Sequence, residues 1–180
     1  MDGTIYFSTP LNIVVAIDAA TGEERWRFDP GAWQEEDFLF GFHRGVSYWR
    51  SEDGEERILY GTFRDFFYSI DARTGTLDPA FGENGRIDLT QGLGRDVDRF
   101  SYSFLSPPII SHDIAVVGST IIDWRAGRPL PELPPPGDVR GIDVRTGEGL
   151  WSFHTVPRDG EFGADTWPEG AWREYGAANV

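Results

Sequence analysis

The chain repeats one short sequence three times, and this repeat restricts the possible folds more than any other feature. The copies are Ala16-Ile-Asp-Ala-Ala-Thr-Gly22, Ser69-Ile-Asp-Ala-Arg-Thr-Gly75 and Gly141-Ile-Asp-Val-Arg-Thr-Gly147. In each copy an apolar stretch ends in Asp, two residues follow, and then comes Thr-Gly. Self-similarity of this kind indicates a repeat architecture.

Each copy predicts a strand, a tight turn and a returning strand. Asp18, Asp71 and Asp143 can accept hydrogen bonds from backbone N–H groups of the turn, and the closing glycine can adopt a positive φ without steric cost. In the first and third copies a tryptophan, Trp26 or Trp151, follows five residues after the Thr. A large flat ring at that position can pack between neighbouring sheets. The second copy has a proline there instead.

The spacing of the copies predicts the fold class. The repeated Asp residues lie 53 and then 72 residues apart, and four short strands per unit at this period describe a β-propeller blade. We therefore predict an all-β partial propeller of about three blades, with repeats at about 1–31, 44–79 and 102–155 in one incomplete domain that covers 1–180. Aromatic residues make up 14% of the chain, with 22 Gly and 12 Pro, which favours a turn-rich β protein. A closed propeller has typically ~4–8 blades, so three blades cannot close a ring.

Two insertions lengthen the second and third units. Residues 80–98 are rich in Gly, Asp and Arg without a clear period, and we predict a long surface excursion of the kind that tends to be functional. Residues 123–138 contain Pro131-Glu-Leu-Pro-Pro-Pro136, which favours an extended, semi-rigid path.

Charge and composition exclude several classes of function. The net charge of -14 argues against nucleic acid or an anionic membrane as a partner. The chain has no Cys, which rules out disulfides and thiolate metal sites. No apolar run approaches the ~20 residues of a membrane helix, and the first residues resemble the start of a strand, not a signal peptide.

Five further segments, taken in order with the repeats, resemble the quinoprotein dehydrogenases, which bind pyrroloquinoline quinone (PQQ) and calcium in an eight-bladed propeller. The resemblance covers essentially the whole chain and is strongest to the membrane-associated glucose and alcohol dehydrogenase branch. The repeat alone also occurs in non-enzymatic propellers. The segments are Tyr6-Phe-Ser-Thr-Pro-Leu-Asn12, Arg44-Gly-Val-Ser-Tyr-Trp49, Phe81-Gly-Glu-Asn-Gly-Arg86, Ser106-Pro-Pro108 with Val117-Gly-Ser119, and Trp151-Ser-Phe-His-Thr-Val-Pro157.

The resemblance implies a set of cofactor-binding residues. Arg44 matches the arginine that pairs with a carboxylate of the quinone, and a guanidinium fork suits a tricarboxylate ligand. Ser119 and Thr120 match a segment that hydrogen-bonds the quinone. Asp123 stands where the family has an acidic calcium ligand, and Ca²⁺ prefers oxygen ligands. Asn179 matches a segment that contacts the cofactor just before a ring-stacking tryptophan.

The chain also departs from the family pattern. Leu105 stands where the family usually has a Thr that contacts the cofactor, and Trp124 stands where the branch commonly has Asn. His43, beside Arg44, could face the same pocket, but a lone histidine at a loop–strand junction is more often structural, so it is left out of the predicted site. The family's catalytic Asp, its partner Arg or Lys, a further calcium Asn and the stacking Trp all fall beyond Val180. We therefore expect an internal piece of a longer gene.

Three interpretations follow from the sequence. The first is a fragment of a PQQ- and calcium-dependent dehydrogenase that oxidises an alcohol or aldose by hydride transfer to the quinone, passes electrons to a cytochrome or ubiquinone, and faces the periplasm. The isolated chain is then predicted to be inactive. The second is a non-catalytic propeller that serves as a protein-binding scaffold. The third is a decayed enzyme, which the departures at Leu105 and Trp124 and the missing tryptophan of the second repeat suggest.

Overall fold

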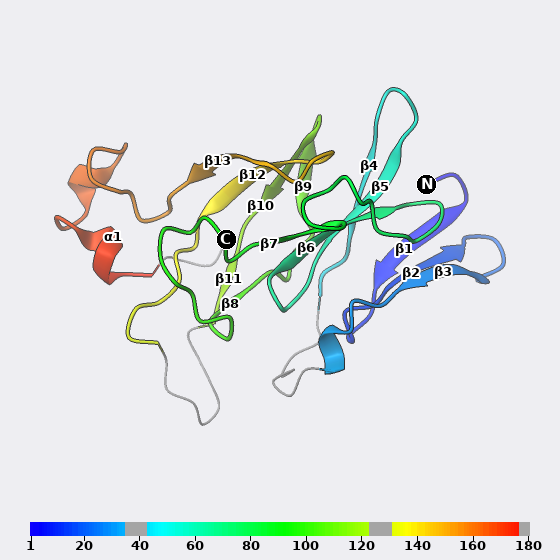
Figure 1. The fold of residues 1–180 in the computed structure, drawn as a ribbon, viewed down its shortest axis with the longest axis horizontal. Coiled ribbons are helices and arrows are strands. Elements are labelled where there is room, and N and C mark those ends of the chain that lie inside the picture. Colours follow the sequence, from blue (N-terminus) through cyan, green and yellow to red (C-terminus); the bar gives the residue numbers. More distant parts are fainter. Residues whose placement is uncertain (35–42, 123–130, 177–180) are drawn as a thin grey trace.

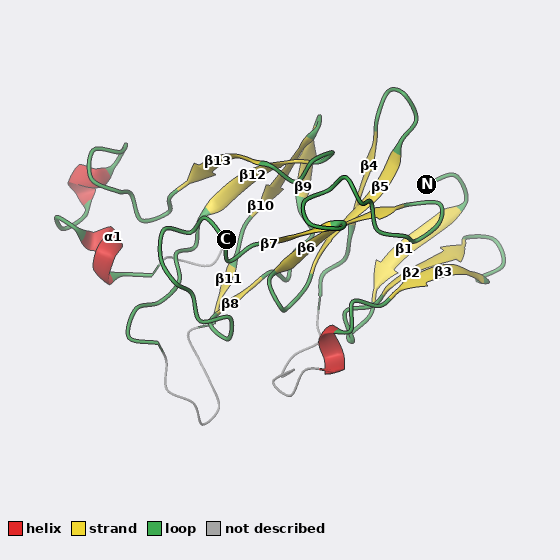
Figure 2. Ribbon diagram, viewed as in Figure 1, coloured by secondary structure: helices red, strands yellow, loops and turns green. Residues whose placement is uncertain are grey.

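The computed structural model describes residues 1–34, 43–122 and 131–176, which form antiparallel sheets with little helix (Figure 1 and Figure 2). Three larger sheets follow one another along the chain and are called blades 1, 2 and 3 below. Blade 1 has the order β1-β2-β3, blade 2 the order β4-β5-β6-β7, and blade 3 the order β9-β10-β12-β13. A short two-stranded sheet, β8-β11, accompanies them. The chain is an open, partial β-propeller, as predicted.

The strand bounds follow the apolar stretches of the sequence. The strands are β1 (Thr4–Ser8), β2 (Val14–Asp18), β3 (Glu24–Phe28), β4 (Ser47–Arg50), β5 (Glu56–Gly61), β6 (Phe66–Asp71), β7 (Arg86–Asp88), β8 (Tyr102–Ser103), β9 (Ile109–Ser111), β10 (Ile114–Val117), β11 (Thr120–Ile121), β12 (Val139–Asp143) and β13 (Gly149–Phe153). Three short helical turns span Ala32–Gln34, Ala164–Thr166 and Ala171–Glu174, and the last of these is α1. No helix in the described ranges has the length and apolarity needed to cross a membrane.

The three repeated turns have the same geometry. In each, the Asp carboxylate accepts hydrogen bonds from the backbone N–H groups two and three residues later, at 2.7–3.0 Å. The glycine N–H then donates to the Asp carbonyl at 2.8–2.9 Å. The glycines Gly22, Gly75 and Gly147 have φ values of 75°, 74° and 77°, a region that costs a residue with a Cβ free energy. The predicted turn chemistry is therefore confirmed.

Trp26 joins blade 1 to the turn of blade 2. Its indole is 9% exposed and its Nε1 donates to the Ala72 carbonyl at 3.0 Å. A Cβ added to Gly75 would come within 2.7 Å of the ring, so the glycine allows this close approach as well as the turn. Trp151 occupies the equivalent position of blade 3, but its ring lies against Gly141 of its own sheet and is 43% exposed.

Blade 2 uses a phenylalanine in place of the missing tryptophan. Phe81 is fully buried and meets Phe67 edge-on with ring centroids 5.9 Å apart. The next residue, Gly82, donates its N–H to the Thr146 carbonyl in the turn of blade 3 at 2.8 Å. A Cβ on Gly147 would lie 3.3 Å from the Phe81 ring. The second repeat therefore also packs against the following turn.

This packing corrects the prediction of a surface excursion at 80–98. Leu89 and Leu93 are buried with Phe81, and β7 adds a fourth strand to blade 2 within the same segment. The sequence pattern did not predict this burial, because glycines and charged residues separate the buried apolar residues at irregular intervals. The segment therefore lacks the regular alternation of a strand.

Two apolar cores lie between the blades. One packs blade 1 on blade 2 and includes Trp26, Tyr60 and Ile70. The other packs blade 2 on blade 3 and includes Phe67 and Ile142. Because each sheet buries one face against the next, the chain is held together by blade-to-blade contacts.

Candidate cofactor site

Arg44 lies just before β4, against the segment that leads into β9. Its backbone N–H donates to the Leu105 carbonyl at 2.9 Å, and its guanidinium Nη1 lies 3.5 Å from the Ser106 hydroxyl. The side chain is exposed, and no carboxylate in the described ranges pairs with it. The guanidinium is therefore available to an anionic ligand.

Ser119 and Thr120 follow β10 and reach the same neighbourhood through the short β8-β11 sheet. Thr120 pairs with Ser103, so residues 102–106 connect these two residues to the Arg44 backbone. Ser119 is 2% exposed. Its hydroxyl lies beside that of Tyr102 but makes no hydrogen bond of standard geometry. A buried hydroxyl without a partner is costly, which fits a ligand-binding role.

Leu105 is 8% exposed and contributes its backbone carbonyl to Arg44. Its side chain cannot hydrogen-bond, so it could not supply the cofactor contact that the resemblance assigns to a Thr at this position. The backbone arrangement that holds the arginine does not need that hydroxyl.

His43 is held tightly next to Arg44. Its ring lies 4.5 Å from the ring of Tyr60 and 6.4 Å from that of Phe104, measured between centroids. Its Nδ1 accepts the Gly45 N–H at 3.2 Å. Burial lowers the pKa of His43 to about 4. The imidazole is therefore neutral at ordinary pH.

Asp65 is a second buried titratable group at this end of blade 2, in the turn between β5 and β6. It has φ 67° and is fully buried. Neither of its carboxylate oxygens has a hydrogen bond, and the nearest cation is Arg99 at 3.8 Å. Burial raises the pKa of Asp65 to about 8, more than the arginines lower it.

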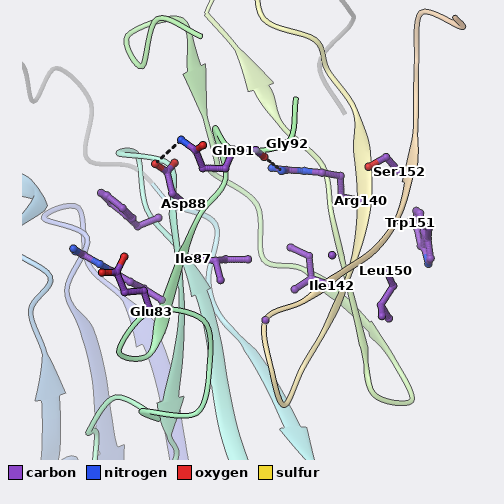
Figure 3. Close-up of a pocket in the computed structure, with 14 residues that line it drawn as sticks. Glu83, Ile87, Asp88, Gln91, Gly92, Arg140, Ile142, Leu150, Trp151 and Ser152 are labelled. Carbon is purple, nitrogen blue, oxygen red and sulfur yellow. Dashed lines mark hydrogen bonds between the residues drawn. The ribbon is translucent and has the colours of Figure 1, made fainter. Parts of the chain in front are cut away.

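A groove of about 820 Å³ lies elsewhere, between β7 and the β12-β13 pair (Figure 3). Arg140 extends across it and donates to the carbonyls of Gln91 at 3.1 Å and Leu89 at 2.6 Å. Glu83 and Ile87 lie on the opposite wall (Figure 3). The predicted site residues that the structure describes, Arg44, Ser119 and Thr120, do not line this groove.

Residues 1–180, the whole chain, match the β-propeller domain of the PQQ family of glucose, ethanol and alcohol dehydrogenases. The chain belongs to this family. The resemblance inferred from the motifs is therefore confirmed.

Similar proteins include the glycerol dehydrogenase large subunit of Gluconobacter oxydans (strain 621H), 32% identical over 155 residues, or 83% of this chain and 20% of that protein. The quinoprotein glucose dehydrogenase of Escherichia coli (strain K12) is 31% identical over 166 residues, or 87% of this chain and 20% of that protein. This chain thus spans about a fifth of the length of these relatives.

The fold agrees with that of solved family members. A quinohemoprotein alcohol dehydrogenase from Pseudomonas putida superposes with a TM-score of 0.70 and 22% identity, covering 99% of this chain and 24% of that one. The enzyme from Comamonas testosteroni gives a TM-score of 0.66 and 22% identity over 88% of this chain and 20% of that one. At this identity the likeness supports the fold alone.

The roles predicted for Arg44, Ser119, Thr120, Asp123 and Asn179 all stay predictions. Asp123 and Asn179, and also Trp124, lie outside the described residues. Within the described part of the chain, no group of three or more His, Asp or Glu side chains could hold a metal ion. The calcium site therefore stays a prediction that rests on the resemblance.

Proposed function

We propose that this chain forms the early blades of a PQQ- and calcium-dependent dehydrogenase and supplies part of its cofactor pocket. The observation that carries this proposal is the exposed guanidinium of Arg44, which pairs with no carboxylate of the described residues, in a chain that matches the PQQ family over its whole length. The backbone N–H of Arg44 donates to the Leu105 carbonyl.

The residues present fit a carboxylated, hydrogen-bonding ligand. A guanidinium binds a carboxylate with two parallel N–H donors. The buried Ser119 hydroxyl adds a group that has no partner of its own, and Thr120 lies next to it in β11. Asp123 would supply a carboxylate to calcium, and Asn179 a polar contact, as the resemblance implies.

PQQ, when bound, supplies the acceptor for a hydride from the carbon of an alcohol or aldose. In this proposal the chain binds and orients PQQ through Arg44, Ser119 and Thr120. It contributes no general base, because the family's catalytic Asp has no counterpart within these residues. The chain alone is therefore expected to be inactive.

The wider role follows from the family and is part of the same proposal. The complete protein would oxidise a small alcohol or sugar and pass its electrons to a cytochrome or to ubiquinone, and it would face the periplasm. Relatives are named for glycerol, glucose and alcohols, so the substrate of this protein stays open.

The two other interpretations predict different behaviour. A scaffold that only binds proteins does not require an arginine without a carboxylate partner, such as Arg44, together with a buried hydroxyl without a hydrogen bond, such as that of Ser119. A decayed enzyme keeps the fold but loses cofactor affinity. The missing tryptophan of the second repeat does not favour decay, because Phe81 packs in its place.

The test is a titration of the chain with PQQ in the presence of calcium, followed by equilibrium dialysis. We expect weak, saturable binding that Arg44→Ala abolishes. The matched control is Arg27→Ala, because Arg27 is also an exposed arginine but lies on β3 and pairs with Glu24. This control should leave PQQ affinity unchanged.

Two outcomes would contradict the proposal. Absence of PQQ binding, or equal affinity of Arg44→Ala and wild type, would remove the cofactor role. A tight, stoichiometric and calcium-dependent complex would show instead that these blades form the whole site, not part of it.

A further inference from the structure

His43 has its ring orientation fixed on three sides. The ring packs between Tyr60 and Phe104, and the Phe104 ring itself fills the space over Gly61, where an added Cβ would come within 1.7 Å of it. On the third side Nδ1 accepts the Gly45 N–H at 3.2 Å. A ring held by two aromatic neighbours and one backbone hydrogen bond cannot turn freely.

The Gly45 hydrogen bond also fixes where the proton of the ring lies. A neutral imidazole carries one N–H, and the nitrogen that accepts a backbone N–H cannot carry it. The ring therefore has its proton on Nε2. Ser8, whose hydroxyl lies 3.5 Å from Nδ1, faces the acceptor nitrogen and does not change this assignment.

The Nε2 atom is buried and has no hydrogen-bond partner among the residues that the structure describes. An unpaired buried donor is unfavourable, and native proteins pair most such groups. The neighbouring residue in sequence is Arg44, whose exposed guanidinium donates to the Ser106 hydroxyl at 3.5 Å and pairs with no carboxylate of the described residues. Two adjacent residues thus offer N–H donors, a buried Nε2 without a partner and an exposed guanidinium without a carboxylate.

We propose that His43 is a second cofactor-binding residue, which donates a hydrogen bond from Nε2 to a carbonyl or carboxylate oxygen of the ligand that Arg44 binds. This inference rests on the proposed function. It adds His43 to the cofactor-binding residues, whereas the sequence alone favoured a structural role for it. His43 acts as a neutral donor, so it adds geometric specificity next to the charge of the arginine.

Two variants separate the roles of the two ring nitrogens. His43→Asn keeps an oxygen acceptor that can reach an N–H two residues later but removes the donor at Nε2. His43→Phe keeps the packing against Tyr60 and Phe104 and removes both nitrogens. We expect each to lower PQQ affinity by about 2- to 10-fold, the range expected for one hydrogen bond. The melting temperature of each variant is measured as well, because asparagine loses the ring contacts with Tyr60 and Phe104 whereas phenylalanine keeps them.

The direct readout is made on the wild-type protein. In protein labelled with ¹⁵N at histidine, the two-bond proton–nitrogen pattern of His43 should identify the Nε2–H tautomer, unchanged from pH 8 to about pH 5. Addition of PQQ should then shift the Nε2 resonance. The chain has 3 His residues, and the spectrum of His43→Asn identifies the signal of His43 by its loss.

The outcomes distinguish this inference from the function on which it rests. PQQ binding that depends on Arg44 but leaves the Nε2 resonance and the affinity of His43→Asn unchanged would overturn the inference and leave the function standing. An Nδ1–H tautomer would also overturn it. If PQQ perturbs neither residue, the proposed function fails as well.

Discussion

Phe81 is the side chain whose removal best tests how blades 2 and 3 are joined. It is fully buried, lies edge-on to Phe67, and directly precedes the glycine that hydrogen-bonds to Thr146 of the next turn. Phe81→Ala therefore removes the group that replaces the missing docking tryptophan of the second repeat.

The expected loss is large. Truncation of a buried phenylalanine to alanine costs ~3–5 kcal/mol, because apolar burial is lost and a cavity remains. With a urea m-value of ~2 kcal/mol/M, the unfolding midpoint should fall by ~2 M. Phe81→Leu keeps most of the volume and should cost less than ~1.5 kcal/mol, which covers the case in which the alanine variant does not fold.

The assay is urea unfolding followed by tryptophan fluorescence, and Phe162→Ala is the matched control. Phe162 is 99% exposed, so the same substitution there should change stability by less than ~0.5 kcal/mol. If Phe81→Ala and Phe162→Ala shift the midpoint equally, the segment at 80–98 is a surface excursion after all and Phe81 does not join the blades.

Three further predictions concern turns, charge and edges. Gly75→Ala and Gly22→Ala both place an alanine at an unfavourable positive φ, but only the Cβ at Gly75 would also meet a ring, that of Trp26. The Gly75 variant should therefore lose ~1 kcal/mol or more of unfolding free energy beyond the loss in the Gly22 variant, measured by thermal unfolding. Equal losses would contradict the docking of Trp26 on this turn. Burial raises the pKa of Asp65 from 3.8 to about 8, so the folded state holds a proton that the unfolded chain releases within this window, and stability falls as the pH rises through it. Asparagine tolerates the left-handed backbone, so the unfolding free energy of Asp65→Asn should rise relative to wild type by up to ~1.4 kcal/mol per pH unit across that window. A difference in urea midpoints that does not depend on pH would argue against a buried, protonated Asp65. The exposed strand β13, with Trp151 at 43% exposure, should make the isolated chain self-associate as its concentration rises. A chain that sediments as a monomer at every concentration would be inconsistent with that.

The turns could be predicted from the sequence because their chemistry is local. An Asp that accepts hydrogen bonds two and three residues later and a glycine at positive φ leave a short signature that recurs in all three repeats. The strands adjoining these turns were predicted for the same reason. The role of Phe81 could not be, because its packing depends on the turn of a different blade, more than sixty residues later in the chain.

The candidate site could likewise be predicted only in part. The motifs identified Arg44, Ser119 and Thr120, but only the pairing of β8 with β11 and the Arg44–Leu105 hydrogen bond bring their segments together. His43 gave one local signal, a histidine two residues before a glycine at a strand start. Its burial depends on aromatic residues from two other segments, so the sequence alone could not distinguish a structural histidine from a donor.

The most direct measurement is to sequence the source DNA on both sides of this reading frame. A chain that forms the early blades of a quinoprotein dehydrogenase should continue into a tryptophan close after Val180, further Asp-x-x-Thr-Gly repeats and an Asp that can act as the base. A stop codon directly after Val180, with none of these repeats in the adjoining sequence, would contradict the dehydrogenase assignment for this product and leave an edge-exposed scaffold or a relic of the enzyme.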